Sequence, residues 1–147
     1  MEVSMSLVVI VPLLPLLTAV IILVGEPQTQ YRRAQLAVLP LVAAFVGALI
    51  TLYIVVSEGP IAVRFYDPSS IANLALPLGF YVDRLSAVMM TLILAVGTIV
   101  YRYSVNYMYE DRFYRRFMAL IGSTTFVLLG MVSSANLIML FIFWQLL

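Results

Sequence analysis

The feature that most constrains this chain is an uncharged apolar run from Met5 to Val24. A membrane-spanning helix needs about 20 mostly apolar residues, because ~30 Å of hydrocarbon is crossed at ~1.5 Å per residue. Pro12 and Pro15 should bend this helix or remove backbone hydrogen bonds from it. A cleaved signal peptide is the other interpretation, but the amino-terminus carries Glu2 and no Lys or Arg, and the run is long for such a segment.

Composition extends this interpretation to the whole chain. The sequence is 64% apolar and 10% charged, against roughly 45–50% and ~25% in ordinary soluble domains. There is no cysteine, histidine or lysine, so disulfides, thiolate metal sites and the usual general base near neutral pH are excluded. We expect an all-α polytopic membrane protein. We expect no catalytic residues in this chain, and we expect it to bind no cofactor, metal or nucleic acid.

The apolar runs predict four transmembrane helices and the start of a fifth. They cover residues 5–24, 34–57, 84–106, 117–134 and 136–147. The last run is only about half the length needed to cross a bilayer. A chain that ends inside an apolar run is typical of a fragment, so we interpret residues 1–147 as the amino-terminal part of one transmembrane domain.

The segment Glu58–Val82 separates the second and third helices and is too irregular to cross lipid. Within it, Ile61–Tyr66 and Leu78–Val82 are rich in β-branched and aromatic residues, which predicts a small β-hairpin outside the membrane. Asp83 follows directly. A carboxylate there can accept hydrogen bonds from free backbone N–H groups, so Asp83 is predicted to cap the third helix.

The arginines predict the orientation of the helices. Lys and Arg are in excess on the cytoplasmic side of membrane proteins. The loops predicted on one side carry six arginines, against two on the other side, Arg64 and Arg84. The six are Arg32, Arg33, Arg102, Arg112, Arg115 and Arg116. We therefore expect a protein of a bacterial inner membrane whose arginine-rich side faces the cytoplasm. The amino-terminus and the hairpin then face the periplasm.

Polar residues inside the predicted spans are the candidate site residues, since such residues are costly in lipid. The fourth span contains Ser123, Thr124, Thr125 and Ser133. Helix packing and hydrogen bonding to carbonyls of the same helix is one interpretation. A hydrated lining along which a proton moves is the other. Gln145 in the fifth run is also a candidate, although an amide can hydrogen-bond but not titrate near neutral pH.

Three motifs in the last half of the chain carry a family resemblance. Leu78–Ser86 reads LGFYVDRLS, Tyr103–Met108 reads YSVNYM and is followed by Asp111 and Arg116-Phe117, and Asn136-Leu137 precedes Trp144. Together they resemble the large antiporter-like membrane subunits of respiratory complex I, the subunit L type, and of Mrp antiporters. The resemblance implies a subunit that passes protons or sodium across a membrane.

One departure from the family pattern affects the predicted function. The residue after the tryptophan is typically a glutamate in the family, and here it is Gln145. A glutamate shifts the pKa of a neighbouring lysine through its charge, whereas a glutamine offers only a dipole. We therefore favour the family branch of the DAB type. In this branch, proton flow drives uptake of inorganic carbon (CO2 or bicarbonate) with a zinc-containing, carbonic-anhydrase-like partner. The alternatives are a proton-pumping subunit of complex I or an Mrp antiporter, with the other subunits as partners, and a structural membrane anchor.

Overall fold

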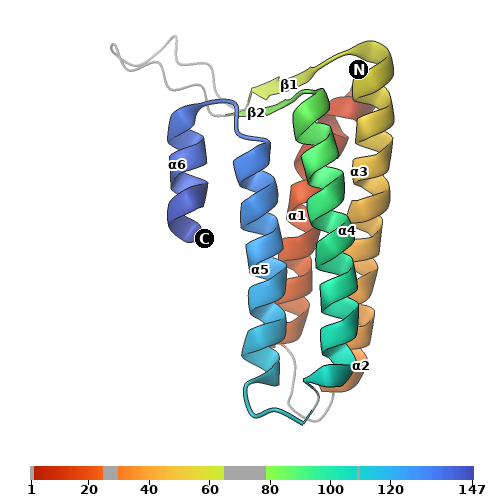
Figure 1. Ribbon diagram of the computed structural model, residues 1–147, viewed down its shortest axis with the longest axis vertical. Coiled ribbons are helices and arrows are strands. Elements are labelled where there is room, and N and C mark those ends of the chain that lie inside the picture. Colours follow the sequence, from red (N-terminus) through yellow and green to blue (C-terminus); the bar gives the residue numbers. More distant parts are fainter. Residues whose placement is uncertain (1, 25–29, 65–78, 109) are drawn as a thin grey trace.

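The computed structural model describes residues 2–24, 30–64, 79–108 and 110–147 (Figure 1). Six helices and two strands make up this part of the chain. They are α1 (Glu2–Val24), α2 (Gln30–Leu36), α3 (Val38–Glu58), β1 (Ile61–Arg64), β2 (Gly79–Val82), α4 (Arg84–Tyr107), α5 (Tyr114–Val132) and α6 (Leu137–Leu146).

Four helical segments are long and apolar enough to cross a membrane. They are Met5–Val24, Tyr31–Glu58, Arg84–Tyr107 and Tyr114–Val132. A shorter apolar helix, Leu137–Leu146, follows them. This confirms the predicted fold class of four transmembrane helices and the start of a fifth, and the chain is a multi-pass membrane protein.

Two helix starts differ in detail from the prediction. The second span contains a break at Ala37, between α2 and α3. Pro40 lies in the first turn of α3, and its ring nitrogen cannot donate to the carbonyl of Leu36, which explains why α2 does not continue as one regular helix. The fourth span begins at Tyr114 instead of residue 117. Just before it, the Oδ1 of Asp111 accepts a hydrogen bond from the Phe113 N–H at 2.6 Å, which forms a turn that leads into the helix.

The four long helices form a bundle in which α1 and α4 each pack against both α3 and α5 (Figure 1). Gly122 permits a close approach of α5 to α1. A Cβ atom added at Gly122 would lie 2.9 Å from the carbonyl oxygen of Pro15. Backbone cannot move away as a flexible side chain can, so only glycine fits at this position of the α1–α5 interface.

Two clusters of buried side chains fill the bundle. The first lies toward the hairpin and includes Val8, Ala48, Val82 and Leu94. The second lies toward the opposite end and includes Ile22, Leu41, Tyr101, Tyr114 and Met118. Since α1, α3, α4 and α5 all contribute to this packing, the bundle has its own interior and does not depend on lipid alone to bury its apolar residues.

The predicted hairpin between the second and third spans is present. Strands β1 and β2 pair antiparallel, with Ile61 opposite Val82 and Val63 opposite Phe80. The predicted strand residues Phe65, Tyr66 and Leu78 lie outside the described residues. Strand β2 has a further neighbour: the Tyr81 N–H donates to the Ser133 carbonyl at 2.9 Å. The turn between α5 and α6 is therefore fastened to the hairpin at one end of the bundle.

Candidate functional site

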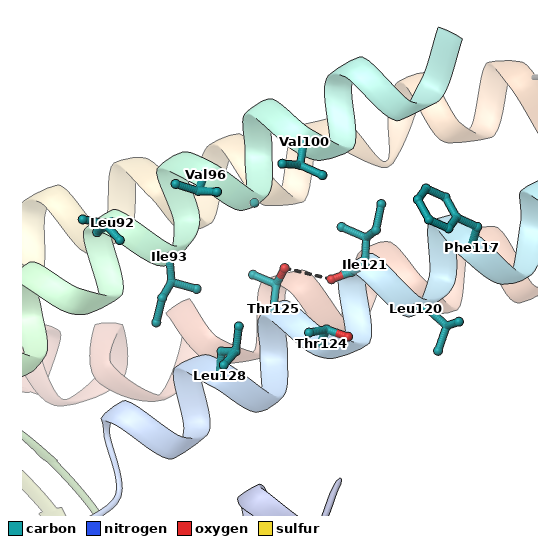
Figure 2. A pocket seen from close by; sticks show the side chains of 11 residues that line it. Leu92, Ile93, Val96, Val100, Phe117, Leu120, Ile121, Thr124, Thr125 and Leu128 are labelled. Carbon is teal, nitrogen blue, oxygen red and sulfur yellow. Dashed lines mark hydrogen bonds between the residues drawn. The ribbon is translucent and has the colours of Figure 1, made fainter. Parts of the chain in front are cut away.

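A groove of about 520 Å³ runs between α4 and α5 (Figure 2). Its walls are almost entirely apolar, and two hydroxyl-bearing residues of α5, Thr124 and Thr125, are the polar members of the lining. The other lining residues are Leu92, Ile93, Val96, Gly97, Val100, Phe117, Leu120, Ile121 and Leu128. The structure thus brings two of the predicted site residues to one groove.

Thr125 of α5 lies close to Gly97 of α4. A Cβ atom added at Gly97 of α4 would lie 3.2 Å from the Thr125 Oγ1. The same hydroxyl donates a hydrogen bond of 2.8 Å to the carbonyl of Ile121 (Figure 2). This bond within the helix satisfies the donor, as expected for a packing role. The oxygen lone pairs remain, so Thr125 can still accept a hydrogen bond from water or from a side chain in the groove.

Ser123 faces a different crevice. It lines a hollow of about 290 Å³ with Leu23 of α1 and with Arg116, Ala119 and Leu120 of α5. Successive residues of a helix are rotated by ~100°, so residues 123 and 125 point away from each other. The candidate residues of α5 therefore do not form one continuous lining.

Ser133 lies at the carboxyl end of α5, where both its side chain and its carbonyl form hydrogen bonds with backbone groups. Its side chain is fully buried, and its hydroxyl donates to the carbonyl of Leu129 at 2.7 Å. Its own carbonyl accepts the hydrogen bond from the Tyr81 N–H of β2. The geometry of Ser133 is that of a residue that ends a helix and joins it to the hairpin.

Gln145 projects from α6, which packs chiefly on α5. Phe143 makes this contact: a Cβ atom added at Gly130 would overlap its ring, and the ring meets Phe126 edge to face with centroids 5.9 Å apart. The Gln145 side chain is exposed, as is that of Trp144. Within the described residues, Gln145 does not line the groove with the threonines.

Asp83 is placed at the N-cap of α4. Its Oδ1 accepts a hydrogen bond of 2.7 Å from the Ser86 N–H. This backbone hydrogen bond favours the carboxylate and lowers the pKa of Asp83 from its ordinary value. Asn136 caps α6 in the same way, accepting from the Met139 N–H at 2.8 Å. Asn136 was missed as a cap, although an asparagine just before an apolar run is a recognisable signal.

Two polar contacts between helices were also missed. The Thr18 hydroxyl of α1 is buried and donates to the Ala37 carbonyl at 3.2 Å, at the break between α2 and α3. The Nε of Arg115 donates to the Ile22 carbonyl at 3.1 Å. Both contacts join segments that are distant in sequence, so no local pattern could have indicated them.

The comparisons with known proteins agree with this architecture. Residues 69–118 match a family described as "NADH-Ubiquinone oxidoreductase (complex I), chain 5 N-terminus". Over 145 residues, or 93% of this chain, the sequence is 36% identical to the chloroplastic NAD(P)H-quinone oxidoreductase subunit 5 of Zygnema circumcarinatum. It is 38% identical over 91 residues, 62% of this chain, to the protein of the same name from Cryptomeria japonica.

The chain spans only 20% and 12% of the lengths of these two relatives. The similarity therefore concerns one part of a larger membrane protein. That part includes the hairpin strand β2, the capped helix α4 and the arginine-rich connection to α5, which all lie within residues 69–118. The chain belongs to the family of complex I antiporter-like membrane subunits and corresponds to their amino-terminal part.

Proposed function

We propose that this chain is part of a membrane subunit that conducts protons, or sodium ions, across the membrane within an NAD(P)H-quinone oxidoreductase. The observation that carries the proposal is the 36% identity to a quinone oxidoreductase subunit over 93% of the chain. The partners are then the other subunits of that complex. This function is the alternative that the sequence offers beside carbon uptake, and the relatives' names favour it.

The membrane-spanning part of the bundle has few groups that can exchange a proton near neutral pH. In the described parts of the four spans, the only carboxylate is Glu58, at the end of α3. A proton that crosses this part of the protein must therefore move through water, because hydroxyls and amides do not titrate near neutral pH. Thr124 and Thr125 can orient such water in the groove between α4 and α5. Gln145, which does not line that groove, can orient water at its own place on α6.

The fold also supports an orientation. In Figure 1, α2, the start of α5 and the ends of α1 and α4 meet at one end of the bundle, opposite the hairpin. Six of the eight arginines belong to these segments or to the α4–α5 connection. By the positive-inside rule, this arginine-rich end faces the cytoplasm and the hairpin faces the periplasm, with the bundle in a bacterial inner membrane.

Proton-driven carbon uptake with a zinc-containing partner is a second candidate, favoured by Gln145. An amide at this position cannot supply the negative charge of the family's usual glutamate. A structural anchor, in which the helices only hold a partner in the membrane, is a candidate of another class. Its support is the scarcity of titratable groups in the described spans.

Purification of the complete protein from its native membranes separates these functions. The complete protein is tagged, extracted in mild detergent, and its co-purifying proteins are identified by mass spectrometry. We expect other quinone oxidoreductase subunits. A soluble zinc protein in their place would overturn the proposal in favour of carbon uptake. The structural anchor would be favoured by a different result. Neither kind of partner would then co-purify, and deletion of the gene would release an unrelated protein from the membrane.

A further inference from the structure

The hydroxyl group of Tyr101 in α4 belongs to a cluster of otherwise mostly apolar side chains. Its side chain is fully buried in the cluster at the arginine-rich end. Its hydroxyl has no hydrogen-bond partner among the described residues, and neither has the buried hydroxyl of Thr98, one turn earlier on the same helix. Residues three apart on a helix lie on the same face. Two unsatisfied hydroxyls therefore belong to one face of α4, inside the bundle.

Several other hydroxyls in the bundle are satisfied. Three threonines donate to the carbonyl four residues earlier in their own helix, at 2.9, 2.9 and 2.8 Å: Thr51, Thr91 and Thr125. The buried Tyr114 hydroxyl donates to the Val105 carbonyl at 3.3 Å. Thr98 makes no such bond to its own helix, although that bond is open to any helical threonine. The exception needs a physical explanation.

We propose that Tyr101 and Thr98 bind ordered water inside the bundle. A buried hydroxyl left without a partner costs of the order of 1–3 kcal/mol. Nearly all such groups in native proteins are bonded to protein or to internal water. Each hydroxyl can donate one hydrogen bond and accept others, so a water molecule beside them meets both donors and acceptors.

The buried face of α4 changes character along its length in a way that agrees with this site. Toward the hairpin it presents Ala87, Met90 and Leu94. Toward the arginine-rich end it presents two hydroxyl-bearing residues, Tyr101 and Ser104, together with Val105, and Thr98 lies between the two regions. Water binding is thus expected only in the half of the bundle nearer the arginine-rich end. The inference concerns hydration and holds whether or not protons cross this part of the protein.

Radiolytic labelling of the complete protein in nanodiscs tests the site directly. Hydroxyl radicals formed from bound water during an X-ray pulse modify side chains that bulk solvent does not reach. We expect Tyr101 to be modified despite its burial, and its modification to fall at least threefold in Thr98→Val. Met118, equally buried in the same cluster, is the internal control. Modification of Tyr101 no greater than that of Met118 would overturn the proposal.

The thermal stability of Tyr101→Phe gives a second test. The sign of the change in its apparent melting temperature decides between a hydrated and a dry hydroxyl. If the hydroxyl binds water, its removal loses a hydrogen bond and the apparent melting temperature of the complete protein falls. If the hydroxyl is dry, its removal relieves a desolvation penalty and the melting temperature rises or stays unchanged, which contradicts the proposal. Tyr103→Phe, at an exposed tyrosine of the same helix, should leave the melting temperature unchanged. If Tyr101→Phe fails to assemble, the labelling of the unmodified protein decides alone.

Discussion

The Nε of Arg115, in the first turn of α5, donates a hydrogen bond to the carbonyl of Ile22, near the end of α1, at 3.1 Å. The last carbonyls of a helix have no partner within the helix and carry its negative dipole end. A guanidinium satisfies one carbonyl and opposes the dipole. Arg115 is therefore a cap for α1 supplied by another helix, in addition to being one of the arginines that orient the protein.

Replacing Arg115 should weaken the α1–α5 contact. We expect Arg115→Gln to lower the free energy of unfolding by about 1 kcal/mol, since hydrogen bonds to charged groups are worth roughly 1.5–3 kcal/mol and this side chain is only partly buried. The apparent melting temperature of the complete protein in detergent measures the change. Arg116→Gln removes the same charge from the next, exposed position and is the matched control. Equal losses in the two variants would show that charge alone matters.

Asp83 should act on stability through its cap. Asp83→Ala is expected to cost about 0.5–2 kcal/mol, while Asp83→Asn should cost little because asparagine caps a helix about as well. Thermal unfolding of both variants checks this. Loss of transport in a stably folded Asp83→Asn protein would instead indicate a role for the charge.

The cap also predicts a pH dependence. The pKa of Asp83 is lowered in the folded protein, so its contribution to stability is present above the unfolded pKa near 3.9 and is lost as pH falls through the folded value. Asp83→Asn should remove this component from the stability profile on the acid side. An identical acid profile in the variant and in the unmodified protein would argue against the carboxylate as the stabilising group.

The local sequence predicted most of the elements and little of the site. Apolar runs of sufficient length predicted the spans, and a carboxylate before an apolar run predicted the Asp83 cap. The hydrogen bond from Arg115 to Ile22 depends on which helices become neighbours, and so does the approach of Thr125 to Gly97. Hydrophobicity shows that a helix is in the membrane but not which face meets which partner, so these contacts could not be read from the sequence.

One feature of the candidate residues follows from the sequence alone. Ser123 and Thr125 are two residues apart on a helix, and helix geometry places such residues on different faces. The structure puts Ser123 in the crevice with Arg116 and Thr125 in the groove with Gly97. Their proposed part in proton movement stays a prediction, and it now concerns two separate places on α5.

The orientation predicts which side of the membrane each loop faces. The chain has no natural cysteine, so single cysteines can be introduced at two exposed positions of the structure, Ala62 in β1 and Arg112 between α4 and α5. Membrane-impermeant maleimide should label Ala62→Cys from the periplasmic side and Arg112→Cys only after the cytoplasmic side is opened. The reverse pattern would show that the positive-inside rule fails for this protein.

Gln145 should influence transport by ordering water and not by binding a proton. Gln145→Leu is then expected to abolish proton-dependent activity, while Gln145→Glu keeps part of it with a new pH dependence as the carboxyl titrates. Proton uptake by vesicles that contain equal amounts of assembled protein compares the two. Full activity of Gln145→Leu would exclude a transport role and leave helix packing as the function of this residue.

Proton uptake driven by quinone reduction tests the central claim most directly. The complete protein, assembled with its co-purifying partners, is reconstituted into liposomes that contain quinone and a pH-sensitive dye. Addition of NAD(P)H should acidify the lumen, and an uncoupler should abolish the signal. Assemblies that lack this subunit should still reduce quinone but move fewer protons per NAD(P)H oxidised. An unchanged proton yield in its absence would contradict the proposal that this subunit conducts protons.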